Sequence, residues 1–493
     1  MKRPLAFLLI VILLQVSCRF NLPVKPTPTP ALVPDPLSLP WEERDIFAPG
    51  LVPASQPILA KLPSASIYHL QLELASDLVH LKGHEEVHYT NAEEQPLPEI
   101  QFRLFPNILG GEMHIPEVLV DGKSITPNYG LNDSLLIVPL STALQPGQSL
   151  TLDLDFTVTI PESLEQNYGV LAYAEGVLAL AHAYPMIPVY NGEGWNAEIP
   201  PQTGDLTFAD MAFFIVRITA PKDLTLVSVG RELSRKLHAE MQTVVFAAGP
   251  VRDYYLIASE DYQSVSKQAG DITVRFFAPK SHQPGARQAL NYATRSIEDY
   301  SRRYALFPYS EIDLAATPTL ALGIEYPGMI AIADRILVPG SQFLEGTVAH
   351  EVAHQWFYNL VGNDQLDQPW LDESLAQFAT LQYFTDQYGN AGYSGFKDSL
   401  EQRWQRVGEA SIPIGLSVTD YTDQEYGAIV YGRGGLFFDA LRSQMGTDKF
   451  DAFIKDYAAT FSWEVATPEG LESLASKHCG CDLTSLFKEW VFP

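Results

Sequence analysis

A short pattern of residues that can bind a metal ion and move a proton, His-Glu-x-x-His, occurs twice in this sequence. The first copy is residues 84–88 (HEEVH) and the second is residues 350–354 (HEVAH). Two imidazoles can hold a divalent metal ion, and the glutamate between them can accept a proton from a metal-activated water. Because so short a pattern also arises by chance, the structure around each copy must decide which one is chemically competent.

The spacing of the two histidines has opposite consequences in a helix and in a strand. On a helix, positions four apart share one face and are separated by a rise of about 6 Å, so both side chains can reach one ion. On a strand the same spacing covers about 13 Å, which a single zinc ion cannot bridge. A competent copy must therefore lie on a helix.

The second copy lies in a segment with helical periodicity, SQFLEGTVAHEVAHQWFYNLVGN. Apolar residues recur at every fourth position from Leu344 to Leu360, which predicts an amphipathic helix near residues 341–361. We expect Ser341 to cap the start of this helix and Gly362 to end it.

A third candidate ligand stands at the start of the next predicted helix, near residues 370–388, where the sequence reads WLDES. Its glutamate, Glu373, follows His354 after 18 intervening residues, which is enough for a helix to end, turn and return antiparallel. Glu373 would then join His350 and His354. Two imidazoles and one carboxylate leave the fourth position of a zinc ion open for water, as in catalytic sites. We predict one Zn²⁺ per chain, with Glu351 as the general base.

The first copy is predicted to lie on a strand. It follows Gly83 and runs into VHYTN, whose residues alternate and favour β-structure. We therefore interpret His84 and His88 as surface or edge residues that hold no metal ion.

The N-terminal part of the chain has the composition of a targeting segment and a spacer. Residues 1–18 combine a basic start, the apolar run LAFLLIVILL and a small residue before Cys18, which is typical of a bacterial lipoprotein signal. An uncleaved membrane anchor is the alternative. Residues 19–60 are rich in proline and are predicted to form an extended tether. The sequence thus predicts an extracytoplasmic protein that is membrane-anchored through a lipid on Cys18, or secreted.

Two further segments differ in their periodicity. Residues 61–262 alternate with period two, most clearly along residues 150–160, and predict an antiparallel β domain. Residues 263–493 predict mainly helices, with a short strand-like stretch at residues 321–333.

The composition excludes several classes of function. The sequence has 32 basic and 59 acidic side chains, a net charge of −27, so its surface repels nucleic acid. Its 46% hydrophobic content is enough to bury a sizeable core. Three cysteines do not make a disulfide framework, although Cys479 and Cys481 could pair locally.

Three segments together resemble the aminopeptidase N family of zinc peptidases, a group of gluzincins. HEVAHQW followed by WLDES resembles the family's zinc signature, with Asp372 and Ser374 in place of asparagine and glycine. Residues 323–328 (GIEYPG) resemble its exopeptidase motif, and residues 431–434 (YGRG) resemble the segment that carries its catalytic tyrosine. The resemblance extends over about residues 66–493.

This resemblance implies an α+β fold in which a saddle-like β domain precedes a thermolysin-like, mainly helical catalytic domain. We expect a short form that lacks the C-terminal helical domain of many members. The resemblance gives Tyr431 the role of stabilising the oxyanion, with Tyr426 as a nearby competitor. Glu325 would bind the substrate's α-ammonium group, while the backbone around Gly323 would pair with the peptide. The alternative for Glu325 is a solvated charge on an edge strand.

The function predicted from these residues is removal of the N-terminal residue of peptides by a metal-activated water. A zinc endopeptidase with the same metal site is the nearest alternative, and another zinc hydrolase acting on esters or epoxides is a further one. A non-catalytic binding protein would be expected to lack a ligand, the base or the tyrosine, and this sequence has all of them.

Overall fold

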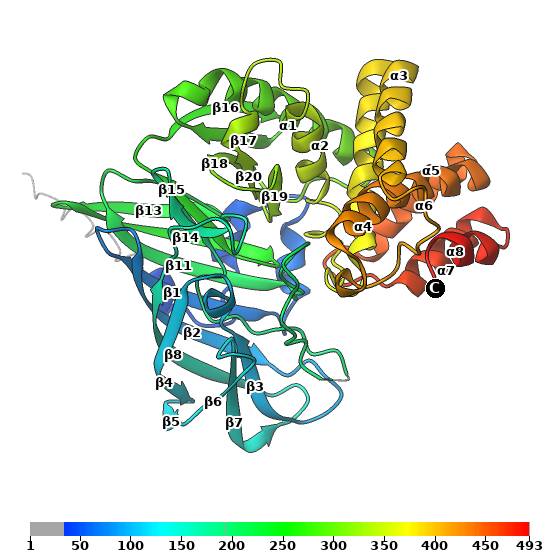
Figure 1. Ribbon diagram of the computed structural model, residues 1–493. Helices are drawn as coiled ribbons and strands as arrows, with labels where there is room; N and C mark the ends of the chain where they lie inside the picture. Colours follow the sequence, from blue (N-terminus) through cyan, green and yellow to red (C-terminus); the bar gives the residue numbers. More distant parts are fainter. Residues whose placement is uncertain (1–33, 193, 493) are drawn as a thin grey trace, which may run out of the picture.

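The largest sheet of the protein has eight strands in the order β13-β14-β11-β1-β2-β8-β4-β5 (Figure 1). This is a computed structural model, which describes residues 34–192 and 194–492. Every neighbouring pair in the sheet is antiparallel except β1 and β11. The strands are β1 Ser66–Leu74, β2 His80–Thr90, β4 Glu112–Val120, β5 Lys123–Ile125, β8 Ser149–Thr159, β11 Ala212–Pro221, β13 Arg231–His238 and β14 Met241–Val251.

The alternation along β8 explains how this sheet builds a core. Its five even-numbered apolar residues, from Leu150 to Val158, are all buried, as the period-two pattern predicts. Two smaller sheets complete this half of the molecule, with orders β12-β15-β10-β9 and β3-β7-β6. Their strands are β3 Leu97–Arg103, β6 Asn128–Gly130, β7 Leu135–Leu144, β9 Leu171–Ala174, β10 Val177–Ala181, β12 Thr225–Ser228 and β15 Tyr255–Ser259.

A separate five-stranded sheet begins at Gln263, with the order β16-β17-β18-β20-β19. Its strand β19, Gly323–Tyr326, pairs antiparallel with β20 and forms the edge of the sheet. The prediction of strand structure at residues 321–333 is therefore confirmed. The other strands are β16 Gln263–Ala269, β17 Ile272–Ala278, β18 Glu311–Thr317 and β20 Met329–Ala333.

Helices form the rest of the C-terminal half. In Figure 1, α1 and α2 lie beside this sheet, and the later helices gather on the other side of α2. They are α1 Gln283–Arg303, α2 Leu344–Ala353, α3 Glu373–Gln405, α4 Asp423–Ala428, α5 Gly434–Met445, α6 Thr447–Thr460, α7 Pro468–Cys479 and α8 Thr484–Trp490, with a π-helical turn, η9, at Ile429–Arg433.

The helix of the second motif is shorter than its periodicity predicts. It begins at Leu344 after Phe343, so Ser341 is not its cap, and it ends at Ala353 rather than near residue 361. The chain continues in wider turns, in which the Asn359 N–H donates to the carbonyl of His354 at 3.0 Å. These turns keep the later apolar positions buried, which is why the period-four pattern extends beyond the helix.

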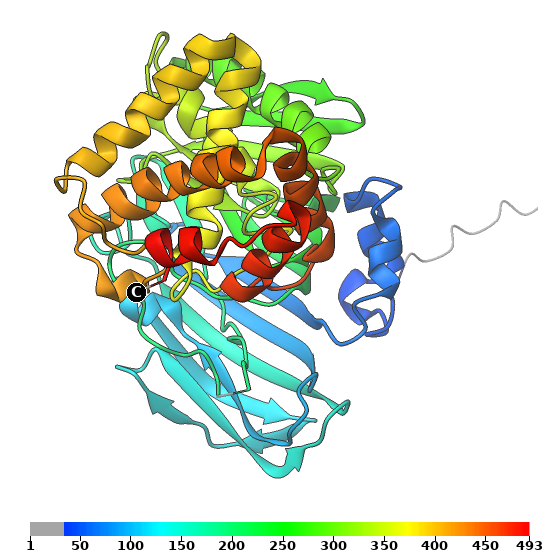
Figure 2. The same cartoon turned by 90° about the vertical axis from the view of Figure 1, so that its right-hand side faces the viewer.

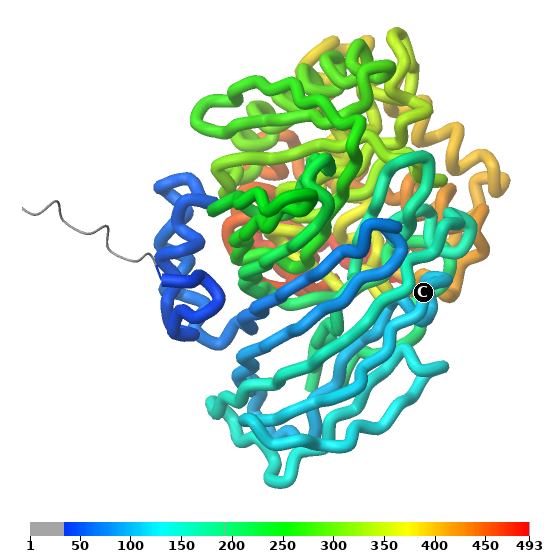
Figure 3. Tube along the Cα trace, turned by 90° about the vertical axis from the view of Figure 1, so that its left-hand side faces the viewer, coloured from blue at the N-terminus to red at the C-terminus, as the bar shows by residue number. Residues whose placement is uncertain are grey.

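Residues 34–60 correct the prediction of a tether that reaches residue 60. This segment forms three short 3₁₀ helices, Pro36–Ser38, Asp45–Gly50 and Gln56–Ala60. Phe47 is buried against Phe213, and Leu51 pairs with Tyr309 of the C-terminal half. Its four apolar side chains that are buried explain why it packs instead of extending. Figures 2 and 3 show this dark blue segment on the flank of the molecule, alongside both halves.

The signal segment, Cys18 and residues 19–33 lie outside the described residues. Within residues 34–192 and 194–492, no helix has the combination of length and apolar character that crossing a bilayer requires. Cys479 and Cys481 are disulfide-bonded to each other at the end of α7.

Candidate metal centre and active site

Three side chains from two helices meet at one point, as their spacing predicts. Nε2 of His350 lies 3.2 Å from Nε2 of His354 and 3.1 Å from Oε2 of Glu373. Nε2 of His354 lies 3.5 Å from the same carboxylate oxygen. His350 lies in the last turn of α2, His354 is the C-cap residue of that helix, and Glu373 is the first residue of α3.

This donor set fits a zinc ion. Ligand atoms that bind one tetrahedral zinc at about 2.0–2.2 Å are separated from one another by roughly 3.3–3.6 Å. The three separations in this site are 3.1–3.5 Å before any ion is placed. Two neutral imidazoles and a carboxylate are the ligands of catalytic zinc sites, and they leave one position for water.

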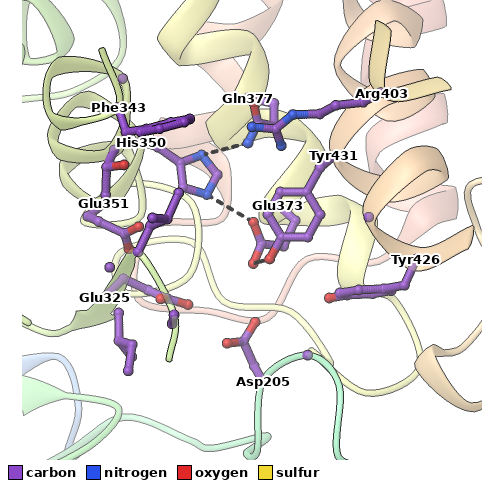
Figure 4. Close-up of a pocket in the computed structure, with 18 of the residues that line it drawn as sticks. Asp205, Glu325, Phe343, His350, Glu351, Glu373, Gln377, Arg403, Tyr426 and Tyr431 are labelled. Atoms are coloured by element: carbon purple, nitrogen blue, oxygen red, sulfur yellow. Dashed lines mark hydrogen bonds and ion pairs between the residues drawn. The ribbon is translucent and has the colours of Figure 1, made fainter. Parts of the chain in front are cut away.

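Further groups hold the histidine rings in position. Nδ1 of His354 lies 3.0 Å from the carbonyl oxygen of Phe357, which is in position to accept its proton. The side-chain amide of Gln377, one turn along α3, lies 3.3 Å from Nδ1 of His350 (Figure 4). With each Nε2 directed toward the metal, each Nδ1 carries the proton, so the Gln377 amide would present its oxygen.

The start of α3 is fixed by the two residues that depart from the family pattern. The carboxylate of Asp372 accepts from the N–H of Glu373 at 2.7 Å and from the side-chain amide of Gln365 at 2.9 Å. The hydroxyl of Ser374 donates to the carbonyl of Val430 at 2.7 Å. Both departures therefore support the position of the third ligand.

Glu351 lies in direct contact with the edge strand. It is 4% exposed, and its Oε2 has no hydrogen-bond partner among the described residues. A Cβ atom added at Gly323 would lie 2.4 Å from the Glu351 carboxylate. Only glycine therefore lets β19 approach the predicted base so closely.

Tyr431 reaches the same centre from the π-helical turn η9, and its hydroxyl donates to Oε1 of Glu373. Gly432 and Gly434 allow this turn to pack on α3. A Cβ on Gly432 would lie 3.0 Å from the backbone of α3, and one on Gly434 would lie 1.9 Å from the Ser374 hydroxyl. A π-helical turn often marks a functional site. The competing Tyr426 makes no contact with the three ligands that the structure records, and its buried hydroxyl has no partner among the described residues.

Glu325 does not project into solvent, which excludes the alternative of an exposed edge-strand charge. It is 8% exposed and faces Asp205, which comes from an irregular loop of the β domain (Figure 4). One oxygen of each and one of Glu373 all lie within 4.8 Å of one another. Asp205 was not predicted from the sequence, because an aspartate in the loop sequence PQTGD is expected to be exposed to solvent. The fold brings this loop to the site.

The centre has an excess of buried negative charge. Burial, followed by repulsion from Glu325, raises the pKa of Asp205 and of Glu351 well above their usual values. Burial also raises the pKa of Glu325. Among the described residues, no lysine or arginine forms an ion pair with these carboxylates or with Glu373. These carboxylates therefore need cations from outside the chain. A bound metal ion and the ammonium group of a bound substrate would be two such cations.

A pocket of about 930 Å³ opens onto these residues. It is bounded by the β domain, the edge strand β19, α2, α3 on both sides of its kink at Gly389, and the segment from α4 to η9. Every residue predicted for the site except His354 lines it. They are Gly323, Glu325, His350, Glu351, Glu373 and Tyr431.

The first copy of the motif lies on β2, as predicted, but at the middle of the eight-stranded sheet rather than at its edge. Nδ1 of His84 lies 2.9 Å from a carboxylate oxygen of Asp155 on β8. His88 stacks on Trp41 with ring centres 5.3 Å apart. The strand is therefore not at an edge, because β1 and β8 flank it on both sides. The alternative of a surface position is confirmed for His84, whose side chain is 37% exposed.

Comparison with known proteins identifies the C-terminal half. Residues 288–490 match the peptidase family M1 domain. This part of the chain is a peptidase family M1 domain. The match confirms the family that the three motifs indicate.

Curated M1 relatives match over most of the chain. Aminopeptidase 2 of Candida albicans is 22% identical over 86% of the chain and 46% of its own length. Aminopeptidase M1-B of rice is 24% identical over 77% of the chain and 45% of its own length. The chain thus spans about half the length of the curated relatives it matches.

Solved structures confirm the predicted architecture. An M1 zinc metallopeptidase from Deinococcus radiodurans, 19% identical, superimposes with a TM-score of 0.65 over 87% of the chain and 93% of its own. A mutant of that protein bound to a Tyr-Ser-Ala substrate, 21% identical, gives a TM-score of 0.67 over the same shares. At this identity the likeness establishes the fold.

Proposed function

We propose that this M1 protein is a zinc-dependent aminopeptidase, which hydrolyses the first peptide bond of peptides with a free N-terminus. The observation that carries the proposal is the pair of buried Glu325 and partly buried Asp205, which faces the metal ligands and has no lysine or arginine partner among the described residues. A free α-ammonium group is the cation that would satisfy both carboxylates. The names of the relatives, which are aminopeptidases, support the same activity.

The edge strand gives the bound peptide its direction. Because β20 is the one strand that pairs with β19 among the described residues, the other edge of β19 can add the peptide as a further strand. Glu325 on this strand and Asp205 across from it then hold the ammonium group and leave room for one residue before the reacting carbonyl. Cleavage would therefore release a single N-terminal amino acid.

The bond-breaking step needs a base, an acid and an oxyanion partner, and the chain supplies each. When bound, zinc lowers the pKa of the attacking water and polarises the carbonyl. Glu351 accepts the proton of that water and returns it to the leaving amine. The Tyr431 hydroxyl, which reaches Glu373 in this structure, turns to the oxyanion as it forms and donates a hydrogen bond.

The test is hydrolysis of aminoacyl arylamides, each beside its N-acetylated twin, with and without a chelator. We expect chelator-sensitive cleavage of the free-amine substrates only. Cleavage of the acetylated twins at comparable rates would instead identify an endopeptidase. Cleavage that survives removal of the metal would contradict the zinc mechanism.

The amine pair can be tested by itself. Glu325→Ala removes one carboxylate and Asp205→Asn removes one charge, so both variants should raise KM for free-amine substrates. We expect roughly a tenfold to hundredfold loss of kcat/KM for Glu325→Ala, and a smaller loss for Asp205→Asn, since each charged hydrogen bond contributes about 1.5–3 kcal/mol. Wild-type kcat/KM in both variants would show that the substrate's α-ammonium group does not bind to Glu325 and Asp205.

We also propose that Cys18 carries a lipid that anchors the protein to the outer face of a membrane. Support comes from the apolar run at residues 5–14 and the small residue before Cys18. Labelling of the expressed protein with a radioactive fatty acid tests this. Label should appear in the wild-type chain and be absent from Cys18→Ser, whereas label in neither would leave an uncleaved anchor or secretion as the explanation for the segment.

A further inference from the structure

Two arginines near the end of α3 line the active-site pocket in an otherwise acidic molecule. Arg403 is half-buried, and Arg406, three residues further along, is exposed. The guanidinium carbon of Arg403 lies 5.9 Å from the centre of the Tyr431 ring. Figure 4 shows its guanidinium pointing into the pocket beside Gln377.

Neither guanidinium has a hydrogen bond or an ion pair with any residue that the structure describes. Arg433, in the adjacent π-helical turn, shows what a structural arginine does in this region. It donates to three backbone carbonyls, those of Ile412, Trp490 and Glu489, and stacks on the Trp490 ring. Because Arg406 is exposed and Arg403 is only half-buried, the N–H donors of both guanidinium groups remain available to a ligand.

Arg403 lies across the metal ligands from the carboxylate pair. In Figure 4, Asp205 and Glu325 are on one side of His350 and Glu373, and Arg403 is on the opposite side. Two further acids line the pocket. Asp423 accepts a hydrogen bond from the hydroxyl of Thr203 at 2.5 Å, and Asp253 lies 3.4 Å from Nδ1 of His182. The pocket therefore has a negative end and a positive end, which matches a molecule with an ammonium and a carboxylate at its two ends.

The distance from the metal ligands to Arg403 is short. Its guanidinium lies over the Tyr431 ring, and the hydroxyl at the far end of that ring donates to Glu373. An extended residue covers about 3.3–3.6 Å, so one or two residues beyond the reacting bond would bring a terminal carboxylate to this arginine. A longer peptide would carry its carboxylate past the pair.

We propose that Arg403 and Arg406 bind the C-terminal carboxylate of the substrate, so that the preferred substrates are di- and tripeptides. A carboxylate can take paired hydrogen bonds from a guanidinium, and two arginines one turn apart can share it. This inference rests on the proposed aminopeptidase function, because it assumes that the ammonium end lies at Glu325. It adds selection by peptide length, with both termini recognised.

The test compares Ala-Ala and Ala-Ala-Ala with their C-terminal amides, using the full-length protein. The wild-type chain should favour each acid over its amide by about tenfold to hundredfold in kcat/KM, the effect of one charge-assisted contact. Arg406→Gln should remove most of this preference, and its loss of kcat/KM on alanine arylamide, which has no carboxylate, should be several-fold smaller than its loss on Ala-Ala-Ala. Arg287→Gln, an exposed arginine on α1 away from the pocket, is the matched control and should keep the preference.

A binding measurement separates recognition from turnover. In Glu351→Gln, calorimetry should show that Ala-Ala-Ala binds about tenfold more tightly than its amide. The difference should vanish when Arg406→Gln is added and return in part with Arg406→Lys. Arg403→Gln is the second variant, and it should reduce the preference as well.

The outcomes distinguish this inference from the proposed function. Equal kcat/KM for acids and amides, with rapid cleavage of both, would overturn carboxylate recognition and leave the aminopeptidase intact. An equal loss of kcat/KM on acids, amides and arylamides in both arginine variants would mean that the arginines act by positioning Tyr431. That result would also overturn carboxylate recognition. Failure to cleave any free-amine substrate would overturn the proposed function, and with it this inference.

Discussion

The two copies of His-Glu-x-x-His show what a sequence motif acquires from the element that carries it. On β2, His84 and His88 lie four residues apart along a strand, and each contacts a different neighbour, Asp155 and Trp41. On α2, His350 and His354 lie one turn apart, and their Nε2 atoms are 3.2 Å from each other. The same letters therefore give two separate histidines in one place and a chelating pair in the other.

The glutamates of the two copies differ less than the histidines. Glu85 is fully buried and Glu351 is 4% exposed, and burial raises the pKa of both. Both have carboxylate oxygens without a partner among the described residues. What separates them is the surroundings, since Glu351 faces a pocket and metal ligands, whereas Glu85 lies inside the β domain near Tyr68 and Tyr184. A buried acid becomes a catalyst only where substrate and metal can reach it.

The largest effect should come from the histidines. His354→Ala removes one of three ligands and should abolish both zinc binding and activity, while His84→Ala should leave one zinc per chain and normal kinetics. Metal content by atomic emission, with kcat/KM on an aminoacyl arylamide, measures both. A loss of metal in His84→Ala would break the comparison, because it would show that the strand copy also binds an ion.

The glutamates give the next largest contrast. Glu351→Gln should keep its zinc and lose about a hundredfold to ten-thousandfold in kcat, the usual contribution of a general base. Glu85→Gln should stay within about twofold of the wild-type kcat, because no substrate reaches it. Turnover at the wild-type rate in a zinc-loaded Glu351→Gln would remove this residue as the base.

A glycine near each glutamate sharpens the comparison further. A Cβ at Gly323 would strike the carboxylate of Glu351, whereas a Cβ at Gly83 would lie 2.0 Å from the ring of Phe156 in the β core. Gly323→Ala should therefore lower kcat with little change in stability. Gly83→Ala should lower stability by about 1–3 kcal/mol, the usual cost of overpacking, while the folded enzyme keeps its kcat.

Thermal denaturation and initial rates on the same samples separate the two effects. If Gly83→Ala lost activity while folded, the β domain would influence the base in a way that the packing does not show. If Gly323→Ala lost stability and kept its kcat, the contact with Glu351 would be structural.

The candidate metal site was predictable because its signals are local. The i, i+4 spacing on α2 and the 18-residue gap to Glu373 specify the ligand set, and residues 323–328 and 431–434 match short patterns. Asp205 and Arg403 had no such signal, because their importance depends on which distant segments the fold brings together. The same limit applies to residues 34–60, where the apolar side chains that pack are separated by prolines that indicate an extended chain.

The end of α2 shows a different limit. The pattern from Leu344 to Leu360 has a period of four over its whole length, but the α-helix ends at Ala353, and the N–H groups of residues 359–361 donate to the carbonyls five residues back. Wider turns preserve almost the same burial pattern, with Trp356 and Leu360 both buried. Hydrophobic periodicity reports which side chains are inside, and it does not distinguish an α-helix from a wider helical turn.

The smallest expected effect is a pH-dependent stability difference at Glu85. Burial raises the pKa of this carboxyl in the folded state, and the groups nearest to it, Tyr68 and Tyr184, are neutral because their own pKa values are also raised. The unfolded chain ionises Glu85 near its ordinary pKa of 4.5. As pH rises above that value, ionisation of Glu85 lowers the free energy of the unfolded state while the folded state stays protonated, so the free energy of unfolding falls until pH reaches the raised pKa.

Glu85→Gln replaces the titratable carboxyl by a neutral amide, so the pH dependence of the free energy of unfolding that Glu85 causes should disappear. The stability of the variant relative to wild type should increase with pH by up to about 1.4 kcal/mol per pH unit above 4.5, and level off at the raised pKa. Denaturant unfolding of zinc-loaded protein at pH 5 and pH 8 measures the difference, and Glu99→Gln, a partly exposed acid of the same domain, is the control. A difference that does not change between the two pH values would mean that Glu85 is ionised in the folded protein, and its burial would then require a cationic partner.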